Sequence, residues 1–159
     1  MTTSIKGVSD AILRFRIFVG TFGIANAGLI LYGSFALLAP DLLMKSFSQN
    51  VYQFPVDAFS AISYLSGLFR LLGFLNLLLG IIGSLLLWRY QMSHEYWLFW
   101  SASVVPTLSY LGPIIFDNTV GTIGLFEIIE HIIFATMIFS GIRMIGVLEI
   151  SRQEALHEE

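Results

Sequence analysis

Three ionisable residues lie close together in an apolar part of the chain, in the segment Glu127-Ile-Ile-Glu130-His131. The surrounding run from Thr119 to Val147 is long enough to cross a bilayer as a helix. In such a helix Glu127 lies one turn from both Glu130 and His131, so the three side chains share one face. Charged groups are costly in hydrocarbon and need a partner, water or a ligand. This segment is therefore the first candidate for a functional site.

The chemistry open to this segment is proton transfer, cation binding or ion pairing. Neighbouring carboxylates disfavour each other's charged form, and an adjacent imidazolium favours it. Glu127 or Glu130 can act as an acid or base on a lipid-like substrate, with His131 assisting. The same carboxylates can instead accept an arginine from a neighbouring helix in a structural ion pair. A metal site is not expected, because metals usually take three or four protein ligands and only one histidine lies in the apolar runs.

Composition places the chain among polytopic helical membrane proteins. Its 159 residues are 56% hydrophobic and 12% charged, and their mean hydropathy is +0.80. Four apolar runs, each of about 20 residues or more, can span a hydrocarbon core of roughly 30 Å. We expect one all-α domain over residues 1–159, an antiparallel four-helix transmembrane bundle. The expected helices cover residues 12–39, 58–88, 95–116 and 119–147.

Several functional classes are disfavoured by the same composition. The net charge is −3 and no basic patch is interleaved with aromatic residues, so nucleic-acid binding is not predicted. The absence of cysteine excludes disulfide and thiolate chemistry. The expected helices use nearly the whole sequence and leave no room for a soluble catalytic module. No cofactor is predicted, although a quinone or a lipid remains open as a ligand.

The segments outside the helices have their own expected roles. Residues 1–10 are polar and are expected to be loose. Asp41 to Phe47 reads as a short amphipathic segment at the membrane surface, with Asp41 and Lys45 one turn apart. Asp117 and Asn118 are expected to form a tight turn and to cap the last helix. A charged tail is expected from Leu148.

Small and polar residues mark the faces on which the first two helices should pack. In the first helix the face holds Gly23, Asn26 and Gly33. In the second helix it holds Arg70, Gly73, Asn76, Gly80 and Gly83. These faces predict close helix contacts and bring Arg70, Asn26 and Asn76 toward the interior.

The third helix contains two prolines, Pro106 and Pro113, which bend it and leave backbone carbonyls without their usual donors. Thr107 and Tyr110 lie on the same face as the prolines. Their hydroxyls can satisfy the freed carbonyls or line a polar cavity. We therefore include both residues among the candidate ligand contacts.

The distribution of basic residues predicts the orientation of the chain. Nearly all lysines and arginines belong to one side, and only Lys45 falls in a loop on the other. The positive-inside rule then places both termini in the cytoplasm. With that orientation Arg70 and Glu127 each lie roughly 10 Å from the midplane at a rise of ~1.5 Å per residue. We predict that Arg70 pairs with Glu127, Glu130 or both, with Asn26, Asn76 and His131 nearer the centre.

Part of the sequence resembles a known family of small membrane proteins. The segments on which the resemblance rests are Gly28-Leu-Ile-Leu-Tyr-Gly33, Pro40-Asp-Leu-Leu-Met-Lys-Ser-Phe47, and Phe69-Arg70-Leu-Leu-Gly73 running to Leu79-Gly80. Over roughly the first half of the chain they are similar to the DoxX-like four-helix proteins. The resemblance implies a four-helix bundle and an association with quinone or redox membrane complexes. The segment from Glu127 to His131 matches no motif of that family.

Three functional hypotheses follow. The first is a membrane protein whose polar pocket binds a lipophilic small molecule such as a lipid, sterol or quinone. The pocket would be built from Asn26, Arg70, Asn76, Thr107, Tyr110, Glu127, Glu130 and His131. The expected partners of such a protein are the lipid bilayer and the small molecule, together with further copies in a homo-oligomer or other subunits of a larger complex. The second is an intramembrane acid–base enzyme, and the third is a proton- or ion-coupled transporter.

Overall fold

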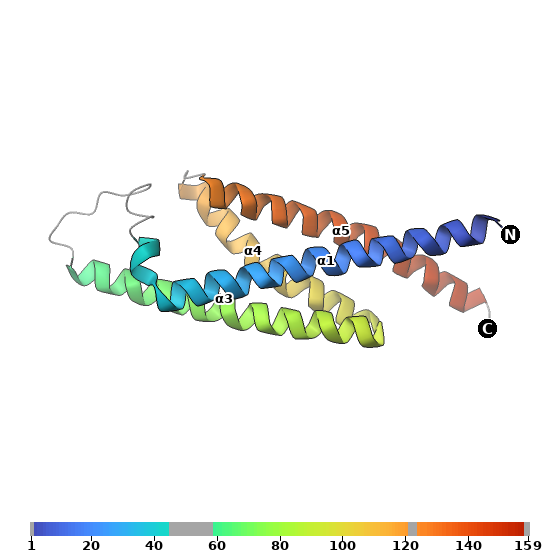
Figure 1. Ribbon diagram of the computed structural model, residues 1–159, viewed down its shortest axis with the longest axis horizontal. Helices are drawn as coiled ribbons and strands as arrows, with labels where there is room; N and C mark the ends of the chain where they lie inside the picture. The colour runs from blue at the N-terminus through green and yellow to red at the C-terminus, as the bar shows by residue number, and fades with distance from the viewer. Residues whose placement is uncertain (1, 45–58, 121–123, 158–159) are drawn as a thin grey trace.

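The computed structural model describes residues 2–44, 59–120 and 124–157, and within these ranges it is helical, with no strand. Four long helices follow one another along the chain (Figure 1). They are α1 (Thr2–Leu38), α3 (Phe59–Ser93), α4 (Tyr96–Val120) and α5 (Leu125–His157). Each contains an apolar span long enough to cross a bilayer. The predicted all-α four-helix membrane bundle is confirmed.

The helices alternate in direction and form a bundle, and only one of its two diagonal pairs of helices is in contact. α1 and α4 run one way and α3 and α5 the other (Figure 1). α1 packs against α3, α4 and α5, and α4 also contacts α3 and α5, whereas the described parts of α3 and α5 do not touch. Both chain termini lie at one end, which we call the terminal end; α1 finishes and α5 begins at the other, the loop end (Figure 1).

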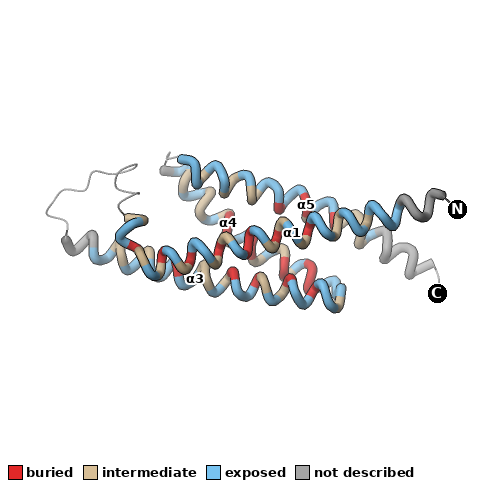
Figure 2. The backbone as a smooth tube through the Cα atoms, in the orientation of Figure 1, coloured by how far each residue is buried: buried red, intermediate tan, exposed pale blue. Residues whose placement is uncertain are grey.

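The outer surface of the bundle is apolar, as a bilayer requires. Buried positions follow the lines where helices meet, and the outward positions are exposed (Figure 2). The exposed residues include Ile24 and Leu31 of α1 and Ile142 of α5, with 65%, 71% and 63% of their surface accessible. Because lipid tails are as apolar as these side chains, burying them against each other gains little, and shape and hydrogen bonds must hold the helices together.

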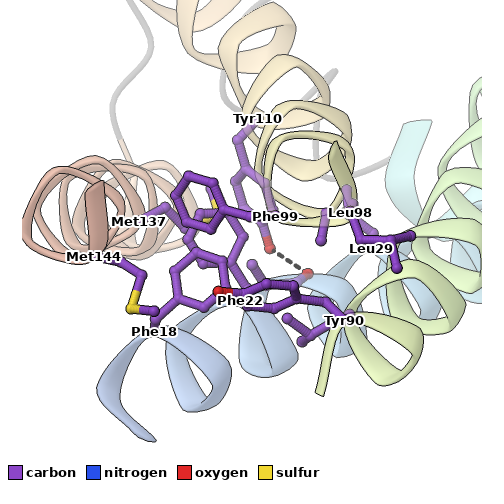
Figure 3. Close-up of a cluster of buried hydrophobic side chains, with 12 residues drawn as sticks. Phe18, Phe22, Leu29, Tyr90, Leu98, Phe99, Tyr110, Met137 and Met144 are labelled. Atoms are coloured by element: carbon purple, nitrogen blue, oxygen red, sulfur yellow. Dashed lines mark hydrogen bonds between the residues drawn. The ribbon is translucent and has the colours of Figure 1, made fainter. Parts of the chain in front are cut away.

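An aromatic core joins all four helices in the terminal half of the bundle (Figure 3). Phe18 of α1 packs on Phe99 of α4, with ring centroids 5.1 Å apart, and meets Tyr90 of α3 edge-on at 5.9 Å. Met137 and Met144 of α5 complete the cluster. Aromatic pairs in these geometries contribute beyond the area they bury, so this cluster stabilises the contact of all four helices.

The helices α1 and α3 meet along a seam of glycines with almost no side chain between them. A Cβ atom added at Gly33 would lie 2.4 Å from the amide nitrogen of Leu77 and 2.6 Å from the carbonyl oxygen of Gly73. One added at Gly73 would lie 2.7 Å from the amide nitrogen of Leu37. Only glycine permits backbones to approach this closely. The predicted packing role of the glycine faces is confirmed.

The predicted helix ends need correction at both termini of the chain. The residues before 12, expected to be loose, are helical from Thr2, and the expected tail continues α5 to His157. Adding a residue to an existing helix gains one hydrogen bond without a new nucleus, so an apolar helix readily extends into polar sequence. The ion pair between Arg14 and Asp10, one turn apart, supports the extension of α1.

The boundary between the last two helices was also predicted wrongly. Asp117 and Asn118 do not form a turn, because α4 continues to Val120. Asn118 donates to the carbonyl oxygen of Ile114 at 2.7 Å, and Thr119 donates to the carbonyl oxygen of Ile115 in the same way. These bonds occupy the side chains within the helix instead of at a cap. α5 therefore begins at Leu125, six residues later than predicted.

The amphipathic segment after α1 is described only in part. A break at Ala39 precedes a helical stretch over residues 40–44. This agrees with the start of the predicted segment. The remainder of that segment, including Lys45 and its expected pairing with Asp41, lies outside the described residues.

Candidate functional site

Six polar side chains gather at the loop end, where α1, α4 and α5 meet. They are Tyr32 of α1, Asp117 and Asn118 of α4, and Glu127, Glu130 and His131 of α5. We call these six residues the polar cluster. The charges of the three carboxylates act on one another or on Tyr32, and Asn118 is hydrogen-bonded to His131. All six lie within the apolar spans of their helices.

His131 is held at both ring nitrogens. Its Nδ1 lies 2.6 Å from the carbonyl oxygen of Glu127, and its Nε2 lies 3.0 Å from Nδ2 of Asn118. A carbonyl oxygen only accepts, so Nδ1 carries the hydrogen. The Asn118 amide group donates one hydrogen to the Ile114 carbonyl and directs its other to Nε2. These two contacts correspond to the Nδ1–H tautomer of the imidazole, and they link α5 to α4.

Glu127 caps the helix that carries it. Its Oε2 accepts a hydrogen bond of 2.8 Å from the backbone N–H of Gly124, the residue before α5 begins. This is the reciprocal bond of a capping box, in which a glutamate at the third helical position turns back to the first free donor. A negative charge at this position also complements the helix dipole. Glu127 thus lies in the first turn of α5, closer to the membrane surface than the predicted helix start implied.

Glu130 lies one turn deeper and has no such partner. It is half-buried, and its charge acts on Tyr32 of α1 and Tyr110 of α4. Among the described residues its carboxylate makes no hydrogen bond or ion pair. An unsatisfied carboxylate in an apolar surrounding is costly. Asp117, near the end of the α4 span, also has no hydrogen bond or ion pair among the described residues. Glu130 is the deeper of these two carboxylates and is therefore the better placed to meet the head of a lipophilic ligand.

The predicted ion pair of Arg70 with Glu127 or Glu130 is not formed. Arg70 is exposed on α3, and the one ion pair among the described residues joins Arg14 to Asp10. The reason is the order of helices around the bundle. α3 and α5 lie diagonally opposite each other and do not touch in the described parts of the chain. A similar depth in the membrane therefore does not bring Arg70 and the glutamates together.

The two asparagines also lie apart from the polar cluster. Asn26 is fully buried, and a Cβ added at Gly83 of α3 would lie 2.2 Å from its Oδ1. Its amide atoms have no hydrogen-bond partner among the described residues; the Cα–H of Gly83 points at the oxygen and gives it a weak contact. Asn76 is half-buried on α3. The single polar focus predicted from the sequence is thus divided between the α1–α3 seam and the loop end.

Tyr110 connects α4 to α1. Its hydroxyl donates to the carbonyl oxygen of Ala25 at 3.0 Å, in the buried part of the bundle (Figure 3). Gly28 leaves the space for this hydroxyl, because a Cβ there would lie 2.6 Å from the oxygen. The hydrogen bond assigns Tyr110 a structural role beside Glu130.

The hydroxyls of α4 serve the helix itself. Thr107 donates to the carbonyl oxygen of Ser103 at 2.7 Å, and Ser103 donates to that of Phe99 at 2.7 Å. Ser109 repeats the pattern with Val105. These are bonds to carbonyls one turn earlier, which are common for hydroxyl side chains in membrane helices. Thr107 therefore does not satisfy the carbonyls freed by the prolines, and its hydroxyl is occupied.

Three members of the cluster were not among the predicted ligand contacts. Tyr32 had appeared only within the family resemblance, and Asp117 and Asn118 only as an expected turn and cap. The available signal was depth: Asp117 lies near the end of the α4 span and Glu127 near the start of the α5 span, so both lie at the loop end. Tyr32 lies in the loop-end part of the α1 span and therefore belongs to the same layer of the membrane.

The cluster as described is not arranged as a metal site, since no three histidine or carboxylate side chains among the described residues converge to bind one. Comparison with protein-family models, with curated proteins and with solved structures finds no match. The geometry of the polar cluster is therefore the basis for a functional proposal.

Proposed function

We propose that the protein binds a lipophilic small molecule at the polar cluster, with the polar head of the molecule against Glu130 and Tyr32. The observation that carries this proposal is the half-buried carboxylate of Glu130 in an apolar span, which has no hydrogen-bond or ion-pair partner among the described residues. Ionisable groups within membrane spans usually mark a substrate or ion pathway. A ligand that donates a hydrogen bond to this carboxylate offsets the cost of removing it from water.

The chemistry of the cluster defines the class of ligand. A hydroxyl or amine on the ligand can donate to Glu130, and the Tyr32 hydroxyl can donate to a ligand carbonyl. The exposed apolar side chains of α1, α4 and α5 offer surface for a hydrocarbon tail. Lipids, sterols and quinones or their reduced forms all combine such a head with such a tail. The family resemblance to DoxX-like proteins stays a prediction and favours the quinone among these.

The hydrogen bonds of His131 favour ligand binding over acid–base catalysis as the function of the cluster. Both of its ring nitrogens are engaged, with Glu127 and Asn118, so the imidazole is not free to exchange a proton with a substrate. Catalysis or proton-coupled transport would depend on Glu130 alone. Turnover that is lost in Glu130→Gln while binding is retained would identify an enzyme instead of a binding protein.

The orientation of the chain belongs to the same proposal. Both termini lie at the terminal end (Figure 1), and the described helices carry five arginines toward that end: Arg14, Arg16, Arg89, Arg143 and Arg152. The positive-inside rule supports a cytoplasmic location for this end. The polar cluster then opens toward the opposite surface of the membrane, where a lipophilic molecule can enter from the outer leaflet.

The test is native mass spectrometry with lipid extraction of detergent-purified wild type, Glu130→Gln and Glu149→Gln. Glu149 is an exposed acid on the same helix near the terminal end, so its variant is matched in charge. A defined molecule should co-purify with wild type and Glu149→Gln and be lost from a folded Glu130→Gln. Equal retention by all three proteins would refute the site, and no retained molecule in wild type would refute ligand binding under these conditions.

A further inference from the structure

On α3, Arg70 carries a charge that has no partner among the described residues. Arg70 is exposed within the span Ser63–Ser93 and makes no hydrogen bond or ion pair with any described residue. Arginine in a membrane span almost always pairs with an acid, a backbone carbonyl or water. The described part of a single chain therefore leaves Arg70 without the partner that it requires.

A complementary charge lies on the opposite side of the bundle. Asp117, Glu127 and Glu130 carry three carboxylates, and no lysine or arginine pairs with them among the described residues. At the loop end, α4 and α5 lie apart from the start of α3 (Figure 1), and the described parts of α3 and α5 do not touch. Arg70 therefore cannot neutralise them within one chain, although the two sets of charges are of opposite sign.

The two sets of charges lie in the same layer of the membrane. Arg70 lies within eight residues of the loop end of the α3 span, and Glu127 and Glu130 lie within six residues of the loop end of the α5 span. Asp117 is the third residue from the loop end of the α4 span. Because all copies of a membrane protein insert with the same orientation, equal depth allows Arg70 of one copy to meet the acids of another.

The surface beside Arg70 is suited to a close helix contact. Gly67, one turn away, is exposed, and a Cβ added there would meet nothing within 4 Å. Small residues at helix surfaces let a second backbone approach in a bilayer. This face therefore has space for a partner helix, and its arginine requires a partner group such as a carboxylate.

We propose that the α3 face carrying Gly67 and Arg70 docks against the α4–α5 face of a second copy of the chain, so that Arg70 completes the polar cluster of its neighbour. The two faces differ, so the contact is heterologous and repeats from copy to copy until a ring closes. The proposal uses the same cluster as ligand binding but does not depend on it. An arginine from the neighbour pairs with Asp117 and Glu127 in the interface between the two copies and leaves Glu130 for the ligand.

Cysteine cross-linking tests the contact directly, because the chain has no cysteine of its own. Gly67→Cys on α3 and Ile128→Cys, an exposed position on α5, are combined in one chain in native membranes. Since α3 and α5 do not touch within the described part of a chain, a disulfide between them reports on two copies. The double variant should give dimers and higher multimers on a non-reducing gel, and each single variant should not.

The charge requirement is tested in the same double-cysteine background. Arg70→Gln should lower the cross-linked fraction at least about tenfold, as expected when one member of a buried interfacial charge pair is removed. Asp117→Asn, on the partner face, should have the same effect. Arg89→Gln is the matched control, since Arg89 is an exposed arginine on α3 at the terminal end, and it should leave cross-linking unchanged.

Two outcomes would overturn the proposal. One is the absence of cross-links although both cysteines react with a maleimide, and the other is an equal cross-linked fraction in Arg70→Gln and Arg89→Gln. Size-exclusion chromatography of each variant shows that it remains folded. Gel mobility does not depend on a retained lipid, so the failure of this contact and the failure of ligand binding are separate results.

Discussion

The glycine seam between α1 and α3 leads to a quantitative prediction for Gly33→Ala. The added methyl group would be placed 2.4 Å from the amide nitrogen of Leu77 and 2.6 Å from the carbonyl oxygen of Gly73. Both neighbours are backbone atoms, which cannot rotate away as a side chain can. The two helices must therefore separate to accept the methyl group.

The size of the effect follows from the required separation. Non-bonded atoms prefer distances of about 3.5–4.0 Å, so the helices must part by roughly 1 Å, and a gap of that size forfeits a quarter to a half of each dispersion contact. Overpacking of this kind costs about 1–3 kcal/mol. The gain in helix propensity of alanine over glycine, up to about 1 kcal/mol, acts in the opposite direction. Gly20→Ala has the same gain without the clash, because nothing lies within 4 Å of its Cβ position.

The assay compares the unfolding free energies of the two variants. Titration of the detergent-solubilised protein with sodium dodecyl sulfate, followed by the fluorescence of the three tryptophans, gives a midpoint for each variant. Because the gain in helix propensity is the same in both variants, Gly33→Ala should be less stable than Gly20→Ala by the overpacking cost of about 1–3 kcal/mol. Equal midpoints would refute the close approach of α1 and α3.

Further predictions concern hydrogen bonds and orientation. Tyr110→Phe removes the bond to the Ala25 carbonyl and should cost about 0.5–1 kcal/mol in the same titration, the range of interhelical bonds in membranes; no change would indicate that the bond is absent. Glu127→Ala should lose about 1 kcal/mol of cap stability whereas Glu127→Gln should lose little, because glutamine also serves in a capping box; equal losses would contradict the cap. Nitrogen-15 NMR of the His131 ring should show Nδ1 protonated and Nε2 unprotonated in wild type, with the Nε2 resonance shifted in Asn118→Ala; a protonated Nε2 in wild type would contradict the proposed bond. Reporter fusions at either terminus should be active only with a cytoplasmic reporter, and a periplasmic or lumenal signal would reverse the proposed orientation.

The features set by hydropathy and by backbone approach could be predicted from the sequence. Four apolar runs predicted four antiparallel helices, and all four are observed. The glycine faces predicted a close contact because the absence of side chains is itself the packing signal. Gly33 and Gly73 show this most directly, since their backbones meet.

Features that depend on the order of helices around the bundle could not be predicted in the same way. Sequence position places Arg70 and Glu127 at a depth, but it does not say whether α3 and α5 are neighbours or lie on a diagonal. The helix ends were displaced for a local reason: Asn118 and Thr119 bond to carbonyls one turn earlier and prolong α4. The predicted helix start placed Glu127 deeper than it lies, whereas Glu127 and Glu130, which were predicted together, differ in that only Glu127 caps α5.

The central claim is that a lipophilic molecule lies in the polar cluster, and photo-cross-linking locates such a molecule most directly. Benzoyl-phenylalanine is introduced in place of Tyr32, and, as a control, in place of Tyr64, which is 71% exposed on α3. After irradiation of native membranes, mass spectrometry identifies the adducts at each position. The account predicts one dominant molecule at position 32 and a mixture like the bulk lipids at position 64. The same bulk mixture at both positions would contradict it.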